Sequence, residues 1–255
     1  DATGNENNAS MVSWNWRANG GTTSTNSAGS LSVTQQVDPS GSFSISTYSG
    51  DGGTDTIGHG LSRAPTMVIV KQRNGANNWA VYAKGAGATK YAYLDSTAAF
   101  GTAAMWNNTT PSSSLVYLGD NNEVNAGSRT YVAYCFADTE GFIKSGSYVG
   151  NGSGTDGTFV YTGFKPAFLM IKKITSNNWR IQDNARDPFN PVYHSLLPNS
   201  AAAEDAYTDG TDYNDFLSNG FKLARGGDTA NWNASGSTFT YLAFAENPFK
   251  YSLAR

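Results

Sequence analysis

The chain is poor in the residues that most often carry chemistry. Its 255 residues include one cysteine, Cys135, and two histidines, His59 and His194. A single cysteine excludes a disulfide within the chain. Cys135 lies in the apolar run "TYVAYCFA" (130–137), which predicts a thiol packed in a core. A nucleophilic role would require one of the two histidines as a neighbouring base.

Charge is also scarce. Charged residues make up 15% of the chain, with a formal net charge of −3, against roughly a quarter in an average protein. Nucleic-acid binding needs a clustered basic face, and the sequence offers none, so we expect no nucleic-acid partner. The short basic pairs at 71–73 and 172–173 are interpreted as solvated strand ends.

Long apolar runs are missing as well. The longest, such as "FLMI" (168–171), are far too short for a membrane-spanning helix, and no secretory signal is evident. We therefore expect no membrane insertion. Because the first residue is Asp, we expect a chain that is processed, or cut from or part of something longer.

Glycine and aromatic residues are plentiful, with 28 Gly, 14 Tyr and 6 Trp. Disordered chains have few aromatics and high net charge, so this composition indicates a folded protein. It suits short strands joined by many polar turns.

The strongest pattern is an internal duplication. The stretch "TYSGDGGTDTIGHGLSRAPTMVIVKQRNGANNW" (47–79) matches "SYVGNGSGTDGTFVYTGFKPAFLMIKKITSNNW" (147–179). The pairs include tyrosine, glycine, proline, lysine and tryptophan: Tyr48 with Tyr148, Gly50 with Gly150, Gly52 with Gly152, Pro65 with Pro166, Lys71 with Lys172 and Trp79 with Trp179.

A second phrase closes each repeat: "TYVAYCFA" (130–137), "TYLAFAEN" (240–247) and, more loosely, "SMVSWNWR" (10–17). The third copy has no opening half. We therefore interpret residues 1–17 as the end of a preceding unit, or as a strand given to a neighbouring unit.

Alternating and continuous apolar runs, bounded by Gly, Pro, Asn and Asp, predict an all-β fold. We expect two duplicated β-sandwich units of jelly-roll-like type at 41–138 and 139–255. Residues 1–40 are expected to hold an N-terminal strand and a linker, with "ANGGTTSTNSAGS" (18–30) flexible or extended. Short helical turns are expected at most within 97–106 and 200–207.

Motifs for catalysis or metal binding are weak. The loops "GDGGTD" (50–55) and "GNGSGTDG" (150–157) could offer oxygen ligands to calcium, but we favour turns that need positive φ. No phosphate loop or nucleophile elbow is present, and sequence alone cannot pair the carboxylates of a glycosidase. We expect no catalytic residue, no metal and no cofactor.

Aromatic residues beside amides suggest a sugar site, because a flat ring stacks on a sugar face and amides bond its hydroxyls. Trp79 and Trp179 are shared by the repeats and are interpreted as core residues. Two tryptophans flanked by polar residues are the better surface candidates. The predicted ligand-binding residues are Trp106, Asn107, Asn108, Trp232, Asn231 and Asn233.

Several long phrases resemble the C-terminal region of tail-fibre-like or structural virion proteins of marine tailed bacteriophages: "GHGLSRAPTMVIVKQR", "TYVAYCFADTEGF", "GSYVGNGSGTDGTFVYTGFKPAFLMIKK", "DFLSNGFKL" and "YLAFAENPFKYSLAR". The resemblance covers nearly the whole chain. It implies a β-protein on the surface of an extracellular virion, and it supplies no catalytic residue. It also implies a homo-oligomer, with a trimer favoured, and other virion proteins as partners.

The function expected from these observations is host attachment, by a phage structural protein of tail-fibre or receptor-binding type that recognises a host surface glycan through loop residues. The alternatives are a capsid decoration or head-fibre protein without a ligand, and a secreted carbohydrate-binding module. A glycan-degrading enzyme is the remaining alternative.

Overall fold

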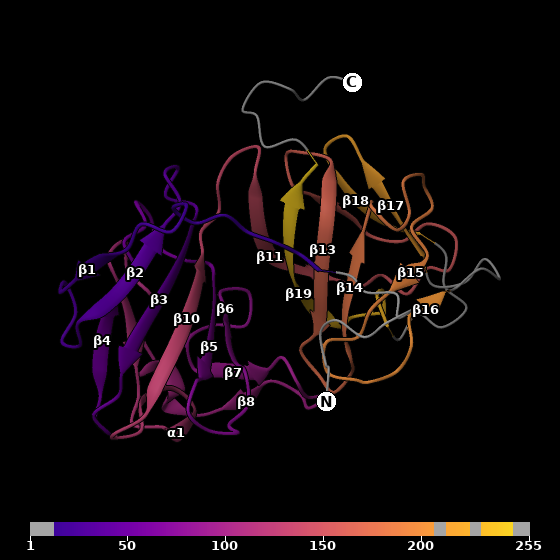
Figure 1. Ribbon diagram of the computed structural model, residues 1–255. Coiled ribbons are helices and arrows are strands. Elements are labelled where there is room, and N and C mark those ends of the chain that lie inside the picture. The colour runs from indigo at the N-terminus through magenta and orange to yellow at the C-terminus, as the bar shows by residue number, and fades with distance from the viewer. Residues whose placement is uncertain (1–12, 207–212, 225–230, 247–255) are drawn as a thin grey trace.

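The computed structural model describes residues 13–206, 213–224 and 231–246 (Figure 1). Nearly all of its regular structure is β, as the sequence predicts. The first half contains β1 (Ser24–Asn26), β2 (Val33–Val37), β3 (Phe43–Ser49), β4 (Asp55–Gly58), β5 (Met67–Gln72), β6 (Ala80–Ala83), β7 (Lys90–Tyr93), β8 (Gly101–Thr102), the 3-10 turn η1 (Ala104–Trp106), β9 (Leu115–Leu118), α1 (Asn122–Asn125) and β10 (Thr130–Phe136). The second half contains β11 (Ile143–Val149), β12 (Phe159–Tyr161), β13 (Pro166–Lys173), β14 (Trp179–Asp183), β15 (His194–Ser195), β16 (Asp205–Ala206), β17 (Tyr213–Leu217), β18 (Gly220–Ala224) and β19 (Thr238–Ala245).

The duplication in the sequence reappears as a repeated strand order. One sheet runs β1-β2-β3-β10-β5-β6-β7-β8, and a second runs β11-β19-β13-β14. The segment β3-β10-β5-β6 and the whole second sheet therefore have the same order and the same antiparallel pairing. We call the half built on β3–β10 the first unit and the half built on β11–β19 the second unit.

Each unit adds a smaller second layer. In the first unit this layer is β4-β9, and in the second it is β12-β18-β17. One apolar core lies between the layers of each unit, with Ile57 and Val116 facing Val70 in the first and Val160 and Phe221 facing Ile171 in the second. These layers have fewer strands than the paired four-stranded sheets of a jelly roll.

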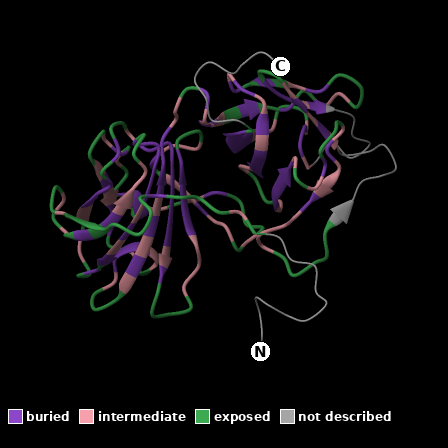
Figure 2. Cartoon of the chain, turned by 45° about the horizontal axis from the view of Figure 1, so that its top comes forward, coloured by how far each residue is buried: buried purple, intermediate pink, exposed green. Residues whose placement is uncertain are grey.

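A third apolar cluster joins the two units. It combines Met67, Ile69 and Phe136 of the first unit with Met170 and Phe244 of the second. The apolar runs of β5 and β13 are continuous because each strand contributes to two cores, one on each face. Figure 2 shows the resulting buried strands in purple, with exposed residues concentrated in the loops. We call the line along which the two main sheets meet the seam.

The first sheet begins before residue 41, the predicted start of the first unit. β1 and β2 extend it through the β2–β3 pairing, and the segment 18–30, expected to be flexible or extended, contains the extended strand β1. The strand predicted at 10–17 is wrong over 13–17, which has no regular structure. Residues 1–12 lie outside the described residues.

The helical predictions are mixed. The turn η1 falls within 97–106, as expected, whereas 200–204 is irregular and β16 follows it. The single-turn helix α1 was not predicted. In the described parts of the chain, no helix is long and apolar enough to cross a lipid bilayer.

Three polar contacts recur in both units, made by a tyrosine, a lysine and an asparagine. The hydroxyl of Tyr48 donates to the Val124 carbonyl at 2.7 Å, and that of Tyr148 donates to the Trp232 carbonyl at 2.8 Å. Each ring stacks on an aromatic residue of the closing strand, at 5.2 Å for Tyr48 and Tyr131 and 5.1 Å for Tyr148 and Phe239. The repeated tyrosine is therefore a core residue that also satisfies a buried carbonyl.

The repeated lysine closes a turn. Lys71 Nζ donates to the carbonyls of Gly75 and Asn77, while Lys172 Nζ donates to those of Lys173 and Thr175 at 3.0 and 3.1 Å. Lys172 is fully buried, so interpreting it as a solvated strand end was wrong. Burial lowers its pKa to about 8.

Candidate functional site

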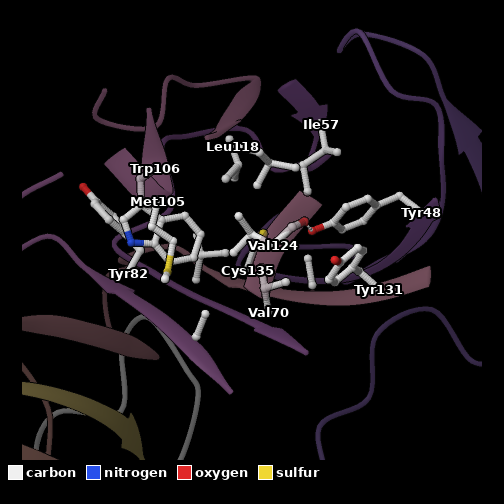
Figure 3. Close-up of a cluster of buried hydrophobic side chains, with 14 of the residues drawn as sticks. Tyr48, Ile57, Val70, Tyr82, Met105, Trp106, Leu118, Val124, Tyr131 and Cys135 are labelled. Atoms are coloured by element: carbon white, nitrogen blue, oxygen red, sulfur yellow. Dashed lines mark hydrogen bonds between the residues drawn. The ribbon is translucent and has the colours of Figure 1, made fainter. Parts of the chain in front are cut away.

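The structure does not support Trp106 as a surface residue. Its side chain is 1% exposed and packs edge-to-face on Tyr82 at 5.9 Å, inside the core of the first unit (Figure 3). The polar neighbours in the sequence are misleading because η1 turns the tryptophan inward while its neighbours stay outside. Trp106 therefore cannot offer a ring face to a sugar.

Asn107 and Asn108 are exposed, and their backbone has left-handed φ values of 47° and 48°. Asn107 follows η1, and its N–H donates to the Ala104 carbonyl at 2.9 Å. Asparagine is favoured in such positions because its side chain tolerates this conformation. Both residues thus form a turn beside the buried ring of Trp106.

The second predicted group is equally internal. Trp232 is 3% and Asn233 is 5% exposed. Asn233 accepts from the backbone N–H of Asn151 at 2.9 Å and donates to that residue's side chain at 2.7 Å. Asn231 is half-buried and accepts from Asn177 at 3.4 Å. The first group lies on η1 in the first unit and the second group precedes β19, so they do not form one site.

Asn125 performs the same task in the first unit. Its side chain accepts from Asp51 N at 3.2 Å and donates to Gly53 O and Asp55 Oδ2 at 2.8 Å each. Each Gly-rich loop is therefore held to the segment before the closing strand by a buried asparagine. The positive φ of Gly52 and Gly152 agrees with the expected turns.

A cleft lies on the seam, where the sequence did not place a site. It has a volume of about 480 Å³, within the range of roughly 300–1,000 Å³ that small-ligand sites occupy. We call it the seam cleft. Both units and the N-terminal segment contribute to its walls, through Ser13–Arg17, Asp38, Phe43, Phe142, Ala167, Phe168, Asp183–Ala185 and Phe244.

Trp16 lies at the centre of this cleft. Its ring contacts phenylalanines from four strands of the two main sheets, at centroid distances between 5.4 and 6.5 Å: Phe43, Phe136, Phe168 and Phe244. The side chain is nevertheless 37% exposed, so part of the ring remains open. In Figure 1 the indigo N-terminal segment crosses between the first unit and the second.

Asp183 holds the neighbouring Trp14 in position. Its carboxylate accepts from Trp14 Nε1 at 3.3 Å, from Arg186 Nε at 2.8 Å, and from the backbone N–H groups of Ala185 and Arg186 at 3.1 and 3.0 Å. Four donors occupy its oxygens, and the side chain is buried. A carboxylate so engaged positions a ring and is poorly suited to act as a general acid or base.

Amide and charged groups surround the aromatic floor. Asn184 lines the cleft, and its side chain makes no hydrogen bond within the described residues. Arg17 and Asn15 also line the cleft and are exposed. The cleft therefore combines an exposed indole, a half-buried indole and open hydrogen-bonding groups, which is the chemistry that binds a sugar.

The remaining reactive side chains do not form a catalytic group. Cys135 is fully buried, as expected, and burial raises its pKa to about 12. His59 is buried directly after β4, and burial lowers its pKa. Within the described residues, no three His, Cys, Asp or Glu side chains gather as metal ligands.

His194 makes one notable contact, because its Nδ1 donates to Asp187 Oδ1 at 2.6 Å. The same carboxylate accepts the N–H groups of Tyr193 and His194. No hydroxyl or thiol of the described residues bonds to His194 Nε2, so the pair lacks a nucleophile. The arrangement stabilises the loop between β14 and β15.

The sequence did carry a signal for the seam cleft. The string "SWNWR" places two tryptophans two positions apart among polar residues, which is the spacing of side chains on one face of an extended chain. Its similarity to the closing strands favoured a different interpretation, and Trp14 and Trp16 were therefore not predicted as site residues.

Comparison with known proteins yields one match. The family described as "Domain of unknown function (DUF7483)" matches residues 1–248. No curated protein matches the chain, and no solved structure matches it. Because the match spans almost the whole sequence, the chain belongs to the DUF7483 family.

Proposed function

We propose that this chain is an attachment protein that binds a host surface glycan in the seam cleft. The observation that carries the proposal is the partly open ring of Trp16, which four phenylalanines fix in place beside the free amide of Asn184. A rigid ring loses little entropy on stacking against a sugar. Binding is favoured over hydrolysis because Asp183 is already fully bonded, and Asp38, the other carboxylate that lines the cleft, accepts from the backbone and side chain of Ser40.

The proposal places the protein on the surface of a tailed-phage particle, as a tail-fibre or receptor-binding component. This part rests on the resemblance of the quoted phrases to structural virion proteins. The composition is compatible with such a role, since few charges and many amide and hydroxyl side chains suit contact with neutral or weakly charged polysaccharides. The chain would contact other virion proteins and assemble as a homo-oligomer.

A glycan array with the purified chain, followed by calorimetric titration of the best-binding oligosaccharide, tests the site. Trp16→Ala should weaken binding about 5- to 30-fold, because stacking on an exposed aromatic is worth on the order of 1–2 kcal/mol. Asn107→Ala is the matched control, since it also alters a loop residue but lies in the turn after η1.

Unchanged affinity in Trp16→Ala would contradict the seam site. No binding to any glycan would contradict glycan recognition as a whole. Immunogold labelling of the particles tests the location separately: gold at fibre tips supports attachment, whereas gold on the head supports a decoration protein.

A further inference from the structure

The second unit exposes a strand edge that the first unit covers. In the first unit, the outer edge of β4 is occupied by the chain segment before β2. Leu31 N donates to the Thr56 carbonyl at 3.0 Å, and Thr56 N donates to Ser30 Oγ at 2.8 Å. β12 takes the corresponding place in the second unit, because each strand follows the opening strand and belongs to the smaller layer.

The outer edge of β12 has no such cover among the described residues. β12 is an edge strand whose one neighbour is β18. Leu223 N donates to the Thr158 carbonyl and Thr162 N to the Asn219 carbonyl, each at 3.0 Å, so alternate residues face β18. The backbone groups of Phe159 and Tyr161 therefore point outward, and the described residues provide no hydrogen bond to them.

The side chains on this edge are apolar and open. Phe159 is 45% and Tyr161 is 65% exposed, and both lie on the outer face of their sheet. Gly220 lies beneath the ring of Phe159, where a Cβ would stand 3.0 Å from ring atoms. An exposed edge strand with aromatic side chains and no inserted charge is a pairing surface that proteins otherwise block.

Chain length explains why the second unit cannot cover itself in the same way. The first unit is preceded by β1 and β2, whereas residues 137–142 alone connect β10 to β11. A connection this short cannot supply an extra strand pair. The adjacent edge of β11 is partly blocked, since Asp138 accepts from Ser145 N at 2.8 Å and Thr158 Oγ1 donates to the Val149 carbonyl at 3.0 Å. β12 is therefore the open position.

We propose that β12 pairs with β12 of a second copy of this chain, antiparallel about a twofold axis through Val160. In this register Phe159 faces Tyr161 of the other copy, and both use backbone groups that point outward. The two smaller layers then form one continuous sheet, in the order β17-β18-β12-β12-β18-β17. A second copy is the occupant we choose because this register is self-complementary. The outward N–H and C=O groups of Phe159 in one copy meet those of Tyr161 in the other.

The complementarity extends to the side chains. The pairing brings aromatic side chains together on one face while Val160 of each copy stays in its own core. Lys222, which pairs with Phe159 across the sheet, forms an ion pair with Asp156, with 2.5 Å between Nζ and Oδ1, so its charge is balanced within each copy. The short strand predicts a weak contact in solution, which several copies on one particle would strengthen through avidity.

Sedimentation and light scattering over a wide range of protein concentration test the proposal. The expected result is a reversible equilibrium between 27.1 kDa and twice that mass. Tyr161→Lys should weaken the dimer about tenfold or more, because it places a charge on the paired edge. Phe189→Lys is the matched control: this side chain is 84% exposed but lies in the loop after β14, so dimerisation should be unchanged.

Thermal unfolding of both variants checks that each remains folded. A conservative Tyr161→Phe variant should keep the dimer, because the pairing uses backbone groups and an aromatic side chain. A monomer at every concentration would overturn the proposal. So would a trimer, or a dimer that Tyr161→Lys leaves intact.

Discussion

The two units share their buried polar contacts and differ in what surrounds them. Each has a tyrosine bonded to a buried carbonyl, an asparagine that anchors a Gly-rich loop, and a lysine that closes a turn. The differences lie at the strand edges and at the seam. Residues that recur in both units therefore build the scaffold. The side chains that stay open, such as Trp16 at the seam and Tyr161 on β12, lie outside these repeated contacts.

The largest expected effect is a difference in stability between alanine variants of the two repeated tryptophans. Trp179 is fully buried at the seam, and its Nε1 donates across to the Tyr93 carbonyl of the first unit at 2.8 Å. Trp79 is half-buried and stacks on Tyr134 at 6.4 Å. Trp179→Ala should lower the free energy of unfolding by about 3–5 kcal/mol, and Trp79→Ala by about half of that or less.

Urea denaturation of both variants measures this difference. Equal losses would mean that the two positions are equivalent and that the seam adds no packing of its own. If Trp179→Ala unfolds in two steps, with the first confined to one unit, then the two units no longer unfold together. That result would show that the seam couples their unfolding in the wild type.

The next effect concerns the buried lysine of the second unit. Burial lowers the pKa of Lys172 to about 8 from 10.5 in the reference state. Between these values the unfolded chain binds more protons than the folded one, so stability should rise with pH from about 8 to 10.5. The gain from this group is about 3 kcal/mol, and Lys172→Met should lack it.

The difference between wild type and Lys172→Met, followed by chemical denaturation at several pH values, isolates the lysine. Deprotonation of Cys135 and of the buried tyrosines opposes folding at high pH, but it contributes to both proteins and cancels. A difference that stays constant from pH 7 to about 10 would contradict the assignment.

A smaller and equal effect is expected from the repeated tyrosines. Tyr48→Phe and Tyr148→Phe each remove the donor to one buried carbonyl while keeping the stacked ring. Each should cost about 1–2 kcal/mol of unfolding free energy. Thermal denaturation of the pair tests the comparison, since a loss in one variant alone would show that the units do not use the tyrosine in the same way.

The sequence predicted the scaffold well because the duplication and the apolar runs report burial directly. The runs before Lys71 and Lys172 became β5 and β13, and the repeated Trp179 is in the core. The site was harder because exposure depends on how a turn directs a side chain. η1 buries Trp106 although polar residues surround it in the sequence.

The contacts of the N-terminal segment were also hard to predict from the sequence. Trp16 resembles a strand residue in the sequence, yet it owes its position to four phenylalanines that are distant along the chain. Such a contact exists only after both main sheets have packed together. The spacing of the two tryptophans in "SWNWR" marks the segment, but it does not encode which distant residues contact Trp16, nor the Asp183 contact that fixes Trp14.

Hydrogen–deuterium exchange of the whole chain, with and without the best-binding oligosaccharide, tests the central claim most directly. We expect added protection in the seam cleft, over residues 13–17 and 183–186, and no change around η1 or residues 231–233. Protection at η1 or at 231–233, with none along the seam, would contradict it.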